Sequence, residues 1–153
     1  MKKIASFTVN HDKLTCGMYI SRIDGDAVTY DIRMKTPNQG DYLGTGEAHT
    51  IEHMFATYAR NSELSDSVIY VGPMGCRTGF YLILRDDVSH ERAISLVQEV
   101  FDFIKDFSGD IPGNSRRECG NYLDHDLEGA RKNAAHMAEV LKDWTPAMMS
   151  YEV

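Results

Sequence analysis

The chain alternates large apolar and polar side chains through Val28-Thr29-Tyr30-Asp31-Ile32-Arg33-Met34. This period of two is typical of a β-strand that buries one of its two faces. A shorter apolar run, Met18-Tyr19-Ile20, lies upstream and is followed by Asp24-Gly25-Asp26, a combination that favours a hairpin turn. We therefore expect an antiparallel pair of strands near the start of the fold.

Helices and further strands are expected downstream of this hairpin. A helix is predicted from about Thr45 to Arg60, with Thr45 as its cap. Short strands are predicted over Val68–Val71 and Phe80–Leu84, and a Gly-rich loop over 72–79 separates them. A second helix is predicted from Ser89 to Phe107. A third helix is indicated by an apolar stripe at helical spacing, formed by Leu127, Ala130, Ala134, Met137 and Leu141.

This order of elements predicts a single domain over residues 1–153. Strands followed by helices, without a regular strand–helix alternation, indicate the α+β class. We expect two layers, with a mostly antiparallel β-sheet and helices packed on one of its faces.

Composition excludes several classes of function. The formal net charge of -7 and the sequence pI of about 5.3 oppose nucleic-acid binding, which needs clustered Lys and Arg. No apolar run approaches the roughly 20 residues that a membrane span needs, and the N-terminus lacks the apolar stretch of a signal peptide. We therefore expect a cytoplasmic protein that binds neither nucleic acid nor membrane. The odd number of cysteines, three, then points to metal-binding or catalytic thiols rather than to disulfides.

The sharpest local motif is His49-Thr50-Ile51-Glu52-His53, whose pattern H-x-x-E-H is that of the inverzincin metallopeptidases. On a helix, positions four apart lie about 40° apart around the axis, so both imidazoles can reach one metal. Glu52 then lies close enough to transfer protons. A catalytic centre of the zinc type needs a third protein ligand, for which Cys119, Cys76 and the other histidines are candidates. A set of two His and one Cys would suit zinc, ferrous iron or cobalt rather than magnesium or calcium.

A second candidate site is the loop Pro73-Met74-Gly75-Cys76-Arg77-Thr78-Gly79. Its glycines let the backbone approach a ligand closely, and Arg77 adds a positive charge that favours a reactive thiolate. The alternative is a tight turn with an inert cysteine. A Cys–His hydrolase is also conceivable, because His11, His90, His125 or His136 are candidate bases for Cys76. Cys16 has no acidic or His neighbour in the sequence, and we interpret it as a packing residue.

Taken in order, three segments resemble the signature segments of the S-ribosylhomocysteine lyase (LuxS) family. They are His49-Thr50-Ile51-Glu52-His53, the loop from Pro73 to Gly79, and Glu118-Cys119-Gly120. Weaker similarities join them, and the whole resemblance runs from about Ser6 to Lys142. These weaker similarities are Ser6-Phe7 followed by His11, Tyr30-Asp31-Ile32-Arg33 followed by Pro37-Asn38, and the segment from His125 to Ala130.

The resemblance implies an activity and the residues that carry it. Members of the family cleave S-ribosyl-L-homocysteine to L-homocysteine and 4,5-dihydroxy-2,3-pentanedione by two carbonyl migrations and a β-elimination. The dione is the autoinducer-2 precursor, which links the activity to quorum sensing and to the activated methyl cycle. The implied roles are metal binding by His49, His53 and Cys119, acid–base catalysis by Glu52 and Cys76, and substrate contacts by Ser6, His11 and Arg33.

The resemblance also implies a cofactor and a partner. The family uses one divalent metal per subunit, usually Fe²⁺, which Zn²⁺ or Co²⁺ can replace. It forms homodimers with active sites at the subunit interface. Two alternatives remain beside it. A small inverzincin-like metallohydrolase or peptidase would take a carboxylate as third ligand, whereas a non-enzymatic metal-binding module would close the site with a fourth ligand from His11 or Cys76.

Overall fold

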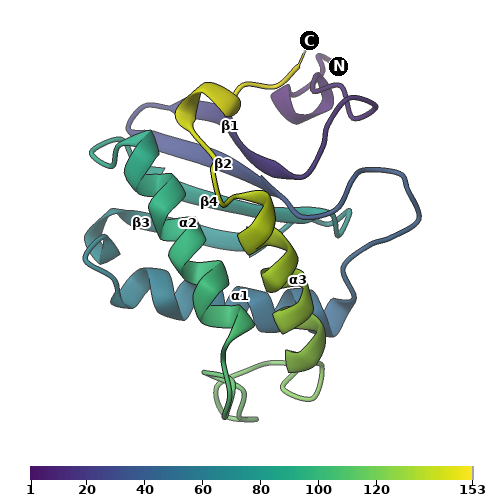
Figure 1. The fold of residues 1–153 in the computed structure, drawn as a ribbon, viewed down its shortest axis with the longest axis vertical. Coiled ribbons are helices and arrows are strands. Elements are labelled where there is room, and N and C mark those ends of the chain that lie inside the picture. The colour runs from purple at the N-terminus through teal and green to yellow at the C-terminus, as the bar shows by residue number, and fades with distance from the viewer. Residues whose placement is uncertain (153) are drawn as a thin grey trace.

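The computed structural model describes residues 1–152, and these residues form a four-stranded sheet and three α-helices (Figure 1). The strands lie in the order β1-β2-β4-β3, and every neighbouring pair is antiparallel. The predicted α+β class is therefore confirmed. The strands are β1 (Gly17–Asp24), β2 (Ala27–Arg33), β3 (Val68–Pro73) and β4 (Gly79–Arg85). The α-helices are α1 (Thr45–Asn61), α2 (His90–Lys105) and α3 (Leu127–Val140), and short 3-10 helices span Ala5–Phe7, Ser65–Ser67 and Pro146–Met148.

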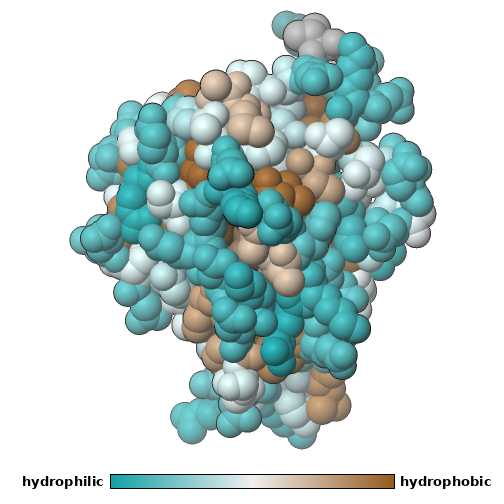
Figure 2. Space-filling model, in the orientation of Figure 1, coloured by the Kyte–Doolittle hydropathy of each residue, from teal (hydrophilic) through white to brown (hydrophobic). Residues whose placement is uncertain are grey.

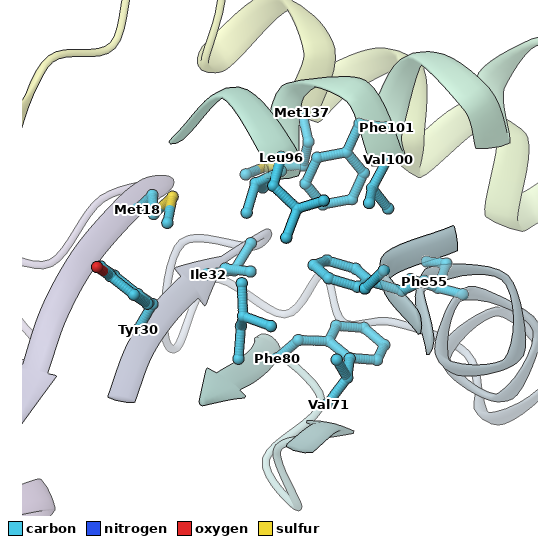
Figure 3. Packing of buried hydrophobic residues seen from close by; sticks show 14 of the residues in the cluster. Met18, Tyr30, Ile32, Phe55, Val71, Phe80, Leu96, Val100, Phe101 and Met137 are labelled. Atoms are coloured by element: carbon cyan, nitrogen blue, oxygen red, sulfur yellow. The ribbon is translucent and has the colours of Figure 1, made fainter. Parts of the chain in front are cut away.

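The core lies between one face of the sheet and the helices (Figure 3). Ile32 of β2 and Phe80 of β4 face Phe55 of α1 and Phe101 of α2, and all four side chains are fully buried. The rings of Phe55 and Phe101 meet edge to face with centroids 6.1 Å apart. Burying a side chain of this size contributes about 1.5–3 kcal/mol to folding. This apolar layer fixes α1 against β3, and α3 packs against α1 and α2.

The predicted elements agree with the structure apart from their ends. The α1 cap is Gly44 rather than the predicted Thr45, because the Gly44 N–H donates to Glu47 at 3.2 Å. The predicted start of α2 is confirmed, since the Ser89 hydroxyl accepts from the Arg92 N–H at 3.1 Å. The hairpin between β1 and β2 turns at Gly25, whose φ of +59° is a conformation that glycine adopts without strain. Of the five residues in the predicted apolar stripe of the third helix, four are fully buried: Ala130, Ala134, Met137 and Leu141.

The second face of β2 is buried as well, which its alternating pattern did not predict. Asp31 and Arg33 alternate with the core residues, yet they are only 1% and 3% exposed. Arg33 donates two hydrogen bonds to Asp31, at 3.1 and 2.7 Å. The Tyr151 hydroxyl donates a third to the same carboxylate at 2.7 Å. A buried ion pair is tolerated where its remaining hydrogen-bonding capacity is filled, and here the C-terminal segment helps to fill it.

The C-terminal segment runs along the free edge of β1, near the N-terminal segment (Figure 1). The Ile20 N–H donates to the Met149 carbonyl at 2.9 Å, and the Trp144 indole donates to the Met18 carbonyl at 2.8 Å. These bonds cover an edge strand that would otherwise expose unpaired backbone groups. The face drawn in Figure 2 is largely hydrophilic with a few small apolar areas. Within residues 1–152, none of the helices has the length and apolar content that crossing a bilayer requires.

Candidate active site

Three of the sequence-predicted ligand residues converge at the first turns of α1. His49 and His53 lie one turn apart, with ring centroids separated by 4.6 Å. The loop before α3 brings Cys119 to them, so that its Sγ lies 3.3 Å from His49 Nε2 and 4.0 Å from His53 Nε2. Cys119 is 70 positions from His49 and 66 from His53 in the sequence, yet the three side chains present two nitrogens and one sulfur to a common point.

The backbone of the same loop sets the orientation of both imidazoles. His49 Nδ1 lies 2.7 Å from the Asp124 carbonyl oxygen, and His53 Nδ1 lies 2.8 Å from that of Pro112. A carbonyl only accepts hydrogen bonds, so each Nδ1 carries the proton and each Nε2 keeps a free lone pair. Gly113 follows with a φ of +70°, and a Cβ there would stand 3.3 Å from His53 Nδ1. Glycine therefore lets the loop approach the ring closely enough for this hydrogen bond.

A fourth side chain, His125, joins this cluster. It was among the histidines predicted as candidates for the third ligand and among the possible bases for Cys76. One donor atom from each of His49, His53, Cys119 and His125 lies within 4.8 Å of the others, and these four residues could hold one metal ion. His125 Nε2 is buried and has no hydrogen-bond partner. Burial, then the neighbouring His49 and His53, lower the pKa of His125.

The chemistry of the donor set fits a bound metal. A buried nitrogen without a partner is rare in folded proteins, so His125 Nε2 indicates that a group absent from the protein itself belongs at this site. The nitrogen and sulfur donors are those that zinc, ferrous iron or cobalt prefer over magnesium or calcium. No local pattern could find His125, because its contact is with Thr50 of α1, where its Nδ1 lies 2.9 Å from the hydroxyl.

Glu52 lies beside the cluster on α1 and is half-buried. Together with His53 it lines a shallow depression of about 440 Å³, whose other walls are formed by β3 and by the loop before α3. Tyr70 and Val71 contribute from β3, and Pro112 and Gly113 from the loop. The Glu52 side chain therefore faces an open space next to the candidate metal ligands.

Cys76 occupies the exposed turn between β3 and β4. Its Sγ lies 3.0 Å from Thr78 Oγ1, and that oxygen accepts a hydrogen bond from Arg33 Nη1 at 2.8 Å. Because the Thr78 oxygen accepts from Arg33, its own hydroxyl hydrogen is free to donate to the Cys76 sulfur. The Arg33 guanidinium is thereby linked to the Cys76 thiol by hydrogen bonds through one intervening side chain, Thr78.

The positive charge near this thiol comes from a residue other than the predicted one. Arg77 directs its guanidinium to the Leu43 carbonyl, at 3.2 Å, and over the Tyr42 ring, at 6.0 Å. Arg33 takes its place. Burial opposes its charge, but the hydrogen bond to Asp31 and the charge of that carboxylate raise the pKa of Arg33.

The predicted substrate residues Ser6, His11 and Arg33 surround Cys76 in one depression of about 360 Å³. Tyr151 also lines it, a position that no sequence pattern predicted. The Tyr151 ring stacks on Tyr19 with centroids 5.2 Å apart. Burial and the nearby Asp31 raise the pKa of Tyr151, so its hydroxyl stays protonated and donates to that carboxylate.

The two depressions are separate within one chain. The Cys76 depression and the Glu52 depression share none of their lining residues, although strand β3 contributes to both. In the part of the chain that the structure describes, the proton-transfer candidates Glu52 and Cys76 therefore face different openings.

Comparison with known proteins gives a consistent result over nearly the whole length. The family model described as S-Ribosylhomocysteinase (LuxS) matches residues 4–148. A Phocaeicola vulgatus protein named S-ribosylhomocysteine lyase is 48% identical, with 99% of this chain and 98% of the relative covered. Proteins of that name from Clostridium acetobutylicum and Clostridium beijerinckii are 46% and 51% identical, with coverage of 99% and 86% of each chain. The family match includes the four residues of the candidate metal cluster (His49, His53, Cys119 and His125) and Cys76, and it ends before Tyr151.

Proposed function

The chain belongs to the S-ribosylhomocysteinase (LuxS) family, and on that premise we propose that it is a metal-dependent lyase for S-ribosyl-L-homocysteine. Its products are L-homocysteine and 4,5-dihydroxy-2,3-pentanedione, the autoinducer-2 precursor. The observation that carries the proposal is the convergence of His49 Nε2, His53 Nε2 and Cys119 Sγ, each free to donate a lone pair.

We propose His49, His53 and Cys119 as the ligands of one divalent metal per subunit, Fe²⁺ in the cell, with Zn²⁺ or Co²⁺ able to replace it. Three protein ligands leave a position for the substrate, as catalytic centres require. A divalent ion held there supplies Lewis-acid polarisation of the carbonyl and enediolate oxygens of the substrate. The thiolate in this set also argues against the metallopeptidase alternative, which needs a carboxylate as third ligand.

The reaction requires proton transfer at several atoms of the substrate. The homocysteine sulfur is attached at C5 and leaves by β-elimination only when a carbonyl stands at C3. The carbonyl starts at C1, so it migrates twice, and each migration removes a proton from one carbon and returns one to the next. We assign this transfer at carbon to Cys76 and the transfer between oxygens to Glu52. A well-placed acid–base group contributes about 10²–10⁴ in rate.

The surroundings of both groups support these assignments. Cys76 is exposed to its depression and receives a hydrogen bond from Thr78, which the buried Arg33 orients. The thiol thus lies next to a hydroxyl and a buried positive charge, and it faces the space where the substrate would bind. Ser6 and His11 line the same depression, where they are available to bind the amino-acid part of the substrate.

We further propose that the chain works as a homodimer in the cytoplasm, with active sites at the subunit interface. The separation of Glu52 and Cys76 into different depressions supports this arrangement. A substrate that needs both groups would then lie between the metal ligands of one subunit and the thiol of its partner. The free thiols of the chain are compatible with a reducing compartment and with a role in the activated methyl cycle.

Anaerobic incubation of the Fe²⁺-loaded protein with S-ribosylhomocysteine tests the proposal. Free homocysteine thiol is expected to appear with wild-type protein and with the control variant Cys16→Ser, because Cys16 lies outside both depressions. It is expected to be nearly absent with Cys76→Ala. No release by a folded, iron-replete wild-type protein would refute the proposed activity.

A further inference from the structure

One buried polar atom of the site has no partner. Among the buried side-chain nitrogen and oxygen atoms of residues 1–152, only His125 Nε2 forms no hydrogen bond. Its other ring nitrogen is well held, because Nδ1 lies 2.9 Å from the Thr50 hydroxyl. That hydroxyl is itself fixed, since its oxygen accepts from the Asp126 N–H at 3.0 Å. The ring is therefore held from behind by α1 and aims its unpaired nitrogen toward the metal ligands.

The orientation of the ring argues against a fourth metal ligand. His125 stacks on His49 with centroids 3.9 Å apart and planes only 19° apart. The lone pair of a ring nitrogen lies in the plane of its own ring, and the planes of two rings stacked this closely run side by side rather than converging on one ion. His49 and His53, in contrast, meet at 86°, which allows their lone pairs to converge. His125 thus lies next to the ligand set without the geometry of a member.

The Thr50 contact leaves His125 able to serve two kinds of oxygen. A hydroxyl both donates and accepts, so Thr50 can hold His125 with the proton on either ring nitrogen. With Nδ1 protonated, Nε2 accepts a hydrogen bond from a hydroxyl group. With Nε2 protonated, it donates to a carbonyl oxygen. A sugar chain in which a carbonyl and a hydroxyl exchange places presents both groups in turn.

We propose that His125 is a substrate-binding residue whose Nε2 hydrogen-bonds the hydroxyl or carbonyl oxygen of an open-chain sugar bound beside His49, His53 and Cys119. This inference rests on the proposed function, because it takes S-ribosylhomocysteine as the ligand. It completes the hydrogen bonding of the buried side-chain nitrogen that residues 1–152 leave unpaired, and it keeps the metal site open.

The first test counts the imidazole ligands by X-ray absorption spectroscopy of the Co²⁺-loaded protein. Two imidazoles and one sulfur are expected in the wild type and equally in His125→Ala. His136→Ala serves as the matched control, since His136 lies exposed on α3 outside the cluster. Three imidazoles in the wild type and two in His125→Ala would make His125 a ligand and overturn the inference.

The second test measures binding of S-ribosylhomocysteine by the visible spectrum of the Co²⁺-loaded protein. The Cys76→Ala background prevents turnover, so the dissociation constant is measured at equilibrium. Adding His125→Ala is expected to weaken binding about tenfold to a hundredfold, while His125→Asn, which keeps a polar group, weakens it less. His136→Ala is expected to leave it unchanged.

The two possible failures are distinguishable. Equal affinity of the Cys76→Ala protein with and without His125→Ala would overturn the role of His125 and leave the proposed function standing. Absence of binding by the Cys76→Ala protein itself, with its Co²⁺ retained, would overturn the proposed function and this inference together.

Discussion

The candidate metal cluster and the Cys76 depression differ in how their polar groups are paired. Around Cys76, an unbroken chain of hydrogen bonds runs from Tyr151 through Asp31, Arg33 and Thr78 to the thiol. In the cluster, His49 Nε2 and His53 Nε2 face one sulfur, and the Nε2 of the adjoining His125 has no hydrogen-bond partner among residues 1–152. The polar groups around Cys76 are therefore paired within the folded chain, whereas those of the cluster need a bound ligand to be paired.

This difference separates preorganisation from binding. A satisfied, buried network holds the thiol environment in one arrangement before substrate arrives, which lowers the cost of reaching the transition state. A cluster of converging lone pairs is unfavourable without a ligand, so it gains most from binding one. We therefore expect substitutions in the cluster to act on metal and substrate binding, and substitutions in the network to act on stability and turnover.

The largest effect is expected from Cys119→Ala, which removes the only sulfur of the cluster. Two imidazoles without the thiolate should not retain a divalent metal through gel filtration. Metal content by mass spectrometry should fall close to zero, and turnover should fall with it. Cys16→Ala is the control and should keep its metal. Full occupancy in Cys119→Ala would remove this residue from the ligand set.

Cys76→Ala should abolish chemistry while sparing the metal. Loss of an acid–base group predicts a fall of about 10²–10⁴ in kcat. Metal content should equal that of the wild type, because the depression around Cys76 contains none of the four cluster residues. Glu52→Gln should behave in the same way. Loss of metal in either variant would show that the residue supports the cluster instead.

Asp31→Ala tests the network directly by leaving the Arg33 charge buried without its partner. Removing one member of a buried ion pair costs about 3–5 kcal/mol of unfolding free energy, measured by urea denaturation. Asp24→Ala is a matched control, because its pair with Arg22 is exposed and should matter little. Similar stability of both variants would contradict the structural role of the buried pair.

The smallest effect is expected from Tyr151→Phe, which deletes one hydrogen bond to Asp31. The loss should be about 1 kcal/mol, because the hydroxyl is only partly shielded from water. Its pH dependence has a definite sign. The folded pKa of Tyr151 is raised, so its contribution is present below pH about 10 and is lost as the pH rises above it. Above pH about 10, the free energy of unfolding should therefore fall less steeply with pH in Tyr151→Phe than in the exposed control Tyr122→Phe.

Local patterns predicted most of the fold and only part of the site. The alternation in β2 and the stripe of α3 depend on neighbours in sequence, so strand and helix were predictable. His49 and His53 were predictable for the same reason, since one helix turn relates them. Cys119 was one of several candidates for the third ligand, favoured because it lies in a loop beside Gly120, and the family resemblance then assigned it that role. The burial of Asp31 was missed because its cover comes from Tyr151, 120 residues later.

His125 illustrates the same limit within the site. Its hydrogen-bond partner Thr50 lies 75 residues away in the sequence, within the H-x-x-E-H motif that predicted His49 and His53 as metal ligands. We expected the positive charge of Arg77 to lie beside the Cys76 thiol, but adjacency in sequence does not set the direction of a long side chain. Arg77 points to Leu43 and Tyr42 instead. The tertiary contacts of β2 instead bring Arg33 to the thiol through Thr78.

The most direct test of the account is an anaerobic titration of metal-free protein with Fe²⁺, in which homocysteine release from S-ribosylhomocysteine is followed at each addition. We expect the rate to rise in proportion to bound iron, to level off at one ion per subunit, and to stay at background throughout in Cys119→Ala. Homocysteine release that is independent of iron, or equal in Cys119→Ala and the wild type, would contradict the proposed metal centre.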